Sequence, residues 1–149
     1  MKTLCVVSCG KRKIWDKYPN AGAQKACDVY VGTFSRKCQE YAKKFYPTSW
    51  YILSAKYGFC SPEKIIPRLY NVCFGDKNTN PLSTAQLAEQ ASELHLDAFE
   101  DIVVLGGQRY VRMIEQIFPS KKIVNPLTGV PGIGYMIKRI NEALSGAAE

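Results

Sequence analysis

Three basic residues directly follow a glycine near the start of the chain. Residues 9–13 read Cys-Gly-Lys-Arg-Lys and come straight after the apolar run Thr3–Ser8. Glycine lets the backbone turn tightly and bring its N–H groups close to a ligand, and adjacent cations favour an anion such as phosphate. The spacing is not that of a Walker loop, so a solvated basic turn is the alternative. The candidate phosphate ligands are Cys9, Gly10, Lys11, Arg12 and Lys13.

A second turn, at residues 54–58, carries a hydroxyl, a cation and an aromatic ring. It follows the apolar run Trp50–Ser54, which is rich in aromatic and β-branched residues and is typical of a buried strand. Ligands of parallel α/β sheets bind at the carboxyl ends of strands, so these residues indicate either a binding site or an ordinary exposed turn. The candidate residues are Ser54, Lys56, Tyr57 and Gly58. The irregular segment 62–76 that follows is expected to cover the site.

Two later strand ends offer further ligands. Residues 102–105 form an apolar run that ends in Gly-Gly and opens into a helix, whose first N–H groups and dipole favour an anion. The last predicted strand, residues 122–125, ends in asparagine. The candidate residues are Gly106, Gly107, Gln108, Tyr110 and Asn125.

These residue types predict a protein that binds a nucleic acid or a nucleotide. The basic turn and Lys56 would hold phosphate, and Tyr57 and Tyr110 would stack on a base. One alternative is an enzyme acting on a nucleotide or modified base, with Asp28 and Lys56 as candidate catalytic residues. Another is a thiol-based redox protein, because neighbouring lysines could lower the pKa of Cys9.

Composition and charge agree with an anionic partner. The 149 residues are 46% hydrophobic and 22% charged, which is typical of a globular chain and excludes a disordered one. Residues 1–75 carry 13 basic and four acidic side chains, whereas residues 76–149 carry seven and nine. The first half is therefore expected to meet the partner. No apolar run approaches the roughly 20 residues that span a membrane, so we expect no membrane partner and a cytoplasmic location.

The six cysteines include no Cys-x-x-Cys pair. This pattern predicts reduced thiols and neither a metal site nor a bound cofactor.

Four short apolar runs alternate with segments of helical spacing. Apolar residues recur at helical intervals over residues 31–45, 87–98, 111–117 and 133–144. A Ser-x-x-Gln capping box at residues 83–86 directly precedes the second of these segments and predicts the start of its helix. Right-handed crossovers would bring all four strand ends to one edge of the sheet. The sequence therefore predicts a single α/β domain over residues 1–149, a three-layer sandwich with a mostly parallel, four-stranded central sheet flanked by helices.

Three of these motifs resemble, in order, those of the YaaA-type peroxide-stress proteins and of small bacterial, archaeal and phage proteins related to them. They are residues 7–11 (Val-Ser-Cys-Gly-Lys), 28–32 (Asp-Val-Tyr-Val-Gly) and 53–59 (Leu-Ser-Ala-Lys-Tyr-Gly-Phe), with Pro62 downstream. The resemblance implies an α/β core like that of uracil-DNA glycosylases, DNA binding, and a role in limiting oxidative DNA damage. No settled enzymatic activity comes with it. The chain is much shorter than the peroxide-stress proteins, and Cys9-Gly10 stands where they tend to have Pro-Ala.

Overall fold

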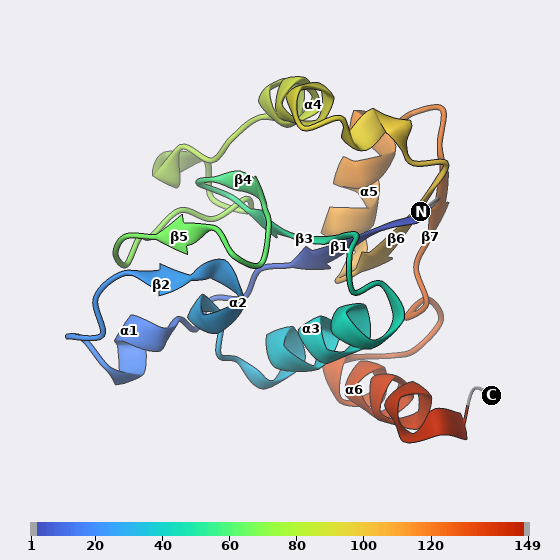
Figure 1. Ribbon diagram of the computed structural model, residues 1–149, viewed down its shortest axis with the longest axis horizontal. Helices are drawn as coiled ribbons and strands as arrows, with labels where there is room; N and C mark the ends of the chain where they lie inside the picture. The colour runs from blue at the N-terminus through green and yellow to red at the C-terminus, as the bar shows by residue number, and fades with distance from the viewer. Residues whose placement is uncertain (1–2, 148–149) are drawn as a thin grey trace.

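A computed structural model describes residues 3–147 and shows an α/β fold around a mostly parallel sheet (Figure 1). The sheet has five strands in the order β4-β3-β1-β6-β7. Their bounds are β1 (Thr3–Ser8), β3 (Trp50–Ser54), β4 (Gly58–Cys60), β6 (Asp101–Leu105) and β7 (Lys122–Val124). β1 is central and pairs in parallel with β3 and β6. Its residues 4–7 are fully buried, as a continuous apolar run in a strand covered on both faces should be.

The sheet contains one strand, β4, that the sequence did not predict. β4 pairs antiparallel with β3, because Gly58 adopts a φ of +75° and lets the chain fold straight back. A three-residue strand is too short for its apolar pattern to separate it from a turn, so the sequence prediction of four strands was wrong here. Two further short strands, β2 (Gln24–Lys25) and β5 (Ile65–Ile66), form a separate antiparallel pair.

Helices cover both faces of the sheet. α3 and α6 pack together on one face, and α4 and α5 on the other (Figure 1). The helices are α1 (Ile14–Lys17), α2 (Ala26–Val29), α3 (Thr33–Phe45), α4 (Thr84–Glu93), α5 (Gln108–Ile117) and α6 (Ile133–Glu142), with the short turns η1 (Lys77–Thr79), η2 (Leu96–Ala98) and η3 (Ala143–Ala147). Within residues 3–147 no helix combines the length and apolar character needed to cross a membrane.

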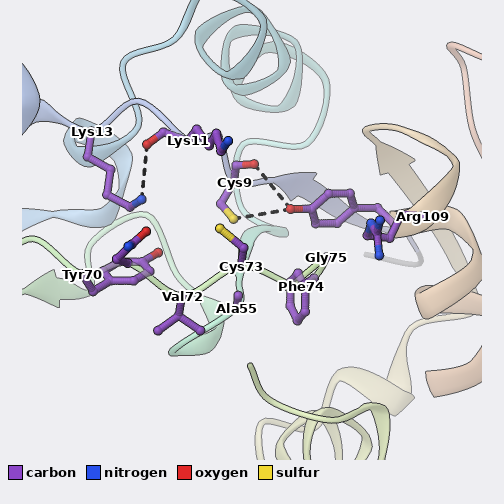
Figure 2. A pocket seen from close by; sticks show the side chains of 13 residues that line it. Cys9, Lys11, Lys13, Ala55, Tyr70, Val72, Cys73, Phe74, Gly75 and Arg109 are labelled. Atoms are coloured by element: carbon purple, nitrogen blue, oxygen red, sulfur yellow. Dashed lines mark hydrogen bonds between the residues drawn. The ribbon is translucent and has the colours of Figure 1, made fainter. Parts of the chain in front are cut away.

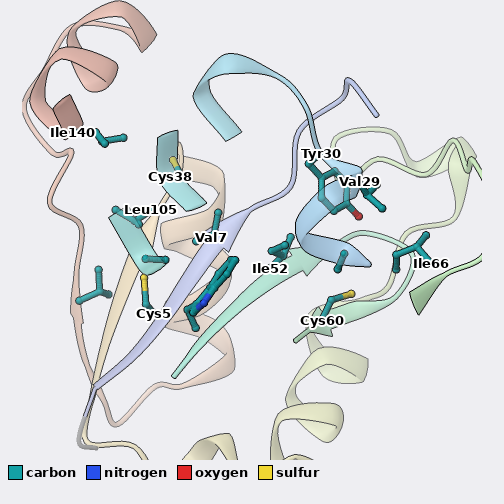
Figure 3. Packing of buried hydrophobic residues seen from close by; sticks show 14 of the residues in the cluster. Cys5, Val7, Val29, Tyr30, Cys38, Ile52, Cys60, Ile66, Leu105 and Ile140 are labelled. Carbon is teal, nitrogen blue, oxygen red and sulfur yellow. The ribbon is translucent and has the colours of Figure 1, made fainter. Parts of the chain in front are cut away.

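Alternation along β1 divides the core into two clusters. Cys5 and Val7 pack with Cys38 of α3 and Ile140 of α6, as Figure 3 shows. The intervening Leu4 and Val6 pack instead with the buried faces of α4 and α5. Successive strand residues point to opposite faces, so one apolar run anchors helices on both sides.

The predicted start of α4 is confirmed. The Ser83 hydroxyl accepts a hydrogen bond from the Gln86 N–H at 3.1 Å, and the Gln86 side chain accepts one from the Ser83 N–H at 2.9 Å. The predicted end is wrong, because α4 stops at Glu93 and His95 adopts a φ of +61°, which interrupts the helix before η2.

Candidate functional site

A cavity of about 230 Å³ opens at the carboxyl ends of β1 and β3 (Figure 2). The turn after β1 contributes Cys9, Gly10, Lys11 and Lys13 to its lining. The turn after β3 contributes Ala55, and the first turn of α5 contributes Arg109 and Tyr110. The remaining wall is the segment 70–75, which the sequence predicted only as a cover of unspecified residues. Three of the four predicted turns therefore share one cavity.

Lys13 is a buried cation whose ammonium forms no ion pair with a carboxylate among residues 3–147. Its side chain is 7% exposed, and its ammonium donates to the Lys11 carbonyl at 3.3 Å and lies 4.6 Å from the centroid of the Tyr70 ring (Figure 2). No carboxylate in the described part of the chain forms an ion pair with it. An ammonium has three N–H donors, and a buried charge is costly unless paired. Lys13 is therefore suited to receive an anion in the cavity.

A chain of hydroxyls stands behind the cavity wall. The Tyr70 hydroxyl is hydrogen-bonded to the Ser54 hydroxyl at 2.9 Å and also to the Tyr30 hydroxyl. Ser54 further accepts from the backbone N–H groups of Lys56 and Tyr57, at 3.2 and 3.1 Å. Burial raises the pKa of both Tyr30 and Tyr70 above the ordinary value, so both phenols are neutral. The predicted residue Ser54 is thus fully buried and positions Tyr70.

The Cys9 thiol lies against Tyr110. Its sulfur is 3.4 Å from the Tyr110 hydroxyl, which also donates to the Cys9 carbonyl at 3.4 Å. Burial raises the pKa of the Cys9 thiol. The hydrogen bonds with Tyr110 and the Ala55 backbone and the charge of Lys13 lower this pKa, but by less, so that it stays above its ordinary value. The expected fall in this pKa is wrong, because removal from water outweighs the nearby cation.

Asp28 does not join the cavity. It lies exposed on α2, where its buried neighbours Val29 and Tyr30 face the core, and it accepts a weak hydrogen bond from the Cys27 thiol at 3.9 Å. Glu63, and to a smaller extent Asp28, raises the pKa of Lys25. Asp28 therefore acts on Cys27 and Lys25, and among residues 3–147 it forms no ion pair with Lys56, the other candidate catalytic residue.

Lys56 and Tyr57 lie beside the cavity but outside its lining. The exposed Lys56 ammonium is 5.5 Å from the centroid of the Tyr57 ring and 5.9 Å from that of Tyr70. Tyr57 is half-buried and stands edge-on to Tyr70, with ring centroids 5.4 Å apart. Arg12 is likewise exposed and outside the lining, because alternate residues of an extended turn point to opposite sides.

Two of the predicted glycines, Gly58 and Gly106, have packing roles outside the lining. A Cβ on Gly106 would stand 2.9 Å from that of Ser8, so this glycine lets β6 approach the end of β1. A Cβ on Gly58 would collide with Gln90, whose side chain accepts from Phe59 and donates to the Tyr57 carbonyl. Gly107 and the exposed Gln108 begin α5 without lining the cavity.

The fourth predicted turn lies away from the cavity. The Asn125 side chain accepts from the Leu127 N–H at 2.9 Å and so shapes its own turn, while Arg139 of α6 donates to the Pro126 and Thr128 carbonyls. β7 is the edge strand, separated from β1 by β6, so its end cannot reach the turn after β1.

Sequence reasoning missed Arg109 and the residues of the segment 70–75. Gly75 leaves room for the Arg109 guanidinium, which would lie 3.2 Å from a Cβ at that position. Phe74 stands edge-on to Tyr110 at 5.9 Å between ring centroids. The irregularity of the segment was the available signal. Across residues 3–147, no three His, Cys, Asp or Glu side chains group as potential metal ligands.

Comparison with known proteins gives two matches. A family model described as "Family of unknown function (DUF6884)" matches residues 4–142. The chain is also similar to the Bacillus subtilis (strain 168) protein described as "Uncharacterized protein YfjM", with 37% identity over 145 residues. That alignment covers 97% of this chain and 96% of the relative.

Proposed function

The chain belongs to the DUF6884 family of unknown function, and we propose that it binds a nucleotide, free or as a unit of a nucleic acid, in the cavity at the ends of β1 and β3. The observation that carries the proposal is Lys13, a buried ammonium that lines the cavity and has no carboxylate partner among the described residues. Charge-assisted contacts to phosphate would satisfy its remaining N–H donors.

Other groups on the cavity wall match the same ligand. Lys11 of the turn after β1 and Arg109 of α5 add two cations. Gly10 has no side chain, so its backbone is accessible to a ligand. The rings of Tyr70, Phe74 and Tyr110 supply apolar wall for a base.

The volume of the cavity limits the ligand inside it to a single nucleotide. A cavity of about 230 Å³ lies below the roughly 300–1,000 Å³ that is usual for drug-sized ligands. A single nucleotide, or its phosphate and sugar with part of the base, is the class that combines this size with these charges. The resemblance of residues 28–32 and 53–59 to the YaaA-type proteins adds a role in DNA protection to the proposal.

The test is calorimetric titration of the protein with mononucleotides, the matching nucleosides and inorganic phosphate. We expect nucleotides to bind more tightly than nucleosides, and Lys13→Met to weaken nucleotide binding at least about tenfold, the loss of one hydrogen bond to a charged group. Replacing an unpaired buried charge by an apolar side chain of similar length should leave the fold intact. Lys44→Met, on an exposed lysine of α3, is the matched control. A folded wild-type protein that binds no nucleotide, or a Lys13→Met variant that binds equally well, would refute the proposal.

A further inference from the structure

Three lysines and two tyrosines form a series of ammonium–ring contacts that starts at the cavity. The ammonium of Lys13 is 4.6 Å from the ring centroid of Tyr70, and that of Lys56 is 5.9 Å from the same centroid. Lys56 is also 5.5 Å from the ring centroid of Tyr57, and the exposed Lys64 is 5.7 Å from the same centroid. The two rings meet edge-on. These five residues, here named the lysine–tyrosine track, lead from the cavity to the exposed surface.

The positive charge of the track is uncompensated. Among the described residues no carboxylate forms an ion pair with Lys13, Lys56 or Lys64, and Glu63, the acidic neighbour of Lys64, is paired with Lys25 at 3.0 Å. An exposed cation–π contact is weak, so the rings orient the ammonium groups without neutralising them. A ligand with a single phosphate at Lys13 would leave Lys56 and Lys64 unused, because neither lines the cavity. The track therefore fits a ligand with several negative charges in succession.

We propose that the track binds the backbone phosphates of a single-stranded nucleic acid whose terminal or unpaired nucleotide occupies the cavity. This inference rests on the proposed function of the cavity. A duplex would have to unpair to place one nucleotide in so small a space, whereas the bases of a single strand are free to leave the stack and contact an aromatic side chain. The half-buried Tyr57 offers that contact midway along the track.

Affinity measured against ligand length tests the inference. Fluorescence anisotropy would give dissociation constants for a mononucleotide, for single strands of two, four and eight nucleotides, and for a duplex of the eight-nucleotide sequence, each at several salt concentrations. We expect affinity to rise with strand length and the duplex to bind more weakly than the single strand. Lys64→Gln should flatten the logarithmic salt dependence for the eight-nucleotide strand by about 0.7, which is about a 5-fold loss at 0.1 M salt.

The mononucleotide and a matched lysine provide the controls. Lys64→Gln should leave mononucleotide affinity unchanged, because Lys64 lies outside the cavity. Lys44→Gln removes an exposed lysine that is 5.5 Å from the ring centroid of Phe45, and it should change neither ligand's affinity. Both lysines are exposed, so we expect both variants to fold, and thermal melting checks this for Lys44→Gln, which loses the hydrogen bond from the Lys44 ammonium to the Leu144 carbonyl.

The outcomes separate the track from the cavity. A mononucleotide that binds as tightly as every longer strand, or equal salt dependence in Lys64→Gln and wild type, overturns the track and leaves the proposed function standing. If the duplex binds as tightly as the eight-nucleotide single strand, or if a polyglutamate peptide binds more tightly than that strand, the choice of a single strand as partner is overturned. Binding of neither mononucleotide nor oligonucleotide overturns both proposals.

Discussion

The Lys13 ammonium lies 4.6 Å from the centroid of the Tyr70 ring, and this contact joins two segments that are far apart in the sequence. Lys13 belongs to the turn after β1, and Tyr70 begins the irregular segment 70–75 that forms the opposite wall of the cavity. The Tyr70 hydroxyl is in turn hydrogen-bonded to Ser54 at the end of β3. The Tyr70 ring therefore contacts the Lys13 ammonium, and the Tyr70 hydroxyl is hydrogen-bonded to the end of β3.

Tyr70→Phe should lower stability more than ligand affinity. The change leaves the Ser54 and Tyr30 hydroxyls without their common partner, which should cost about 1–3 kcal/mol of unfolding free energy. The ring under Lys13 remains, so nucleotide affinity should change little. Urea unfolding and calorimetric titration measure the two effects. Tyr135→Phe, on a side chain that is 59% exposed, should change neither, and an unaltered unfolding curve for Tyr70→Phe would contradict the role of its hydroxyl.

Tyr57→Ala and Phe59→Ala should have opposite effects. Phe59 is 3% exposed and packs edge-on against Phe118, so its truncation should cost about 3–5 kcal/mol of stability. Tyr57 is half-buried beside the cavity, so its truncation should cost less stability but weaken oligonucleotide binding by about 1–3 kcal/mol. Thermal melting and anisotropy titration distinguish the two variants. If both simply unfold, the turn after β3 is a packing element and has no place in binding.

Lys11→Ala and Arg12→Ala should differ, although the two residues are adjacent. Lys11 lines the cavity and Arg12 does not. Loss of one phosphate contact should flatten the salt dependence of single-strand binding by about 0.7 in Lys11→Ala and by less in Arg12→Ala. Oligonucleotide titrations between low and moderate salt give the slopes. Equal slopes for both variants and wild type would remove this turn from the interface.

Alkaline pH should destabilise the protein through its buried thiols. Burial raises the pKa of Cys38 and Cys60 to about 12 each. Above the ordinary thiol pKa of about 8.5 the unfolded chain binds fewer protons than the folded one, so unfolding free energy falls with rising pH. This contribution is complete below about pH 8.5 and is lost as the pH rises towards about 12. Urea unfolding at several pH values should show a shallower decline in a Cys38→Ala/Cys60→Ala variant than in wild type, and an identical decline would assign the effect to other groups.

Local pattern was sufficient to predict the parallel strands and the residue types at their ends. The runs that became β1, β3 and β6 are short, apolar and bounded by glycine or small polar residues, because each is buried on both faces and must turn at its end. Gly10, Lys11 and Lys13 could be predicted to share one site, because a basic turn at a strand end is a feature of contiguous residues, and all three line the cavity. An apolar ring with no polar tip likewise predicts inward packing at position 59, and Phe59 is buried.

Tertiary structure decided which of those residues meet. Strand order placed β7 at the edge of the sheet and so removed Asn125 from the cavity, and the packing of Val29 and Tyr30 turned Asp28 outward. Burial reversed the expected pKa of Cys9, because the cost of desolvating a thiolate depends on everything packed around it. The segment 70–75 has no periodicity, and its place opposite Lys13 depends on contacts with Ser54 and Tyr30 that are distant in the sequence. Neighbours along the chain determined the kind of chemistry available, whereas long-range packing determined which groups stand together to perform it.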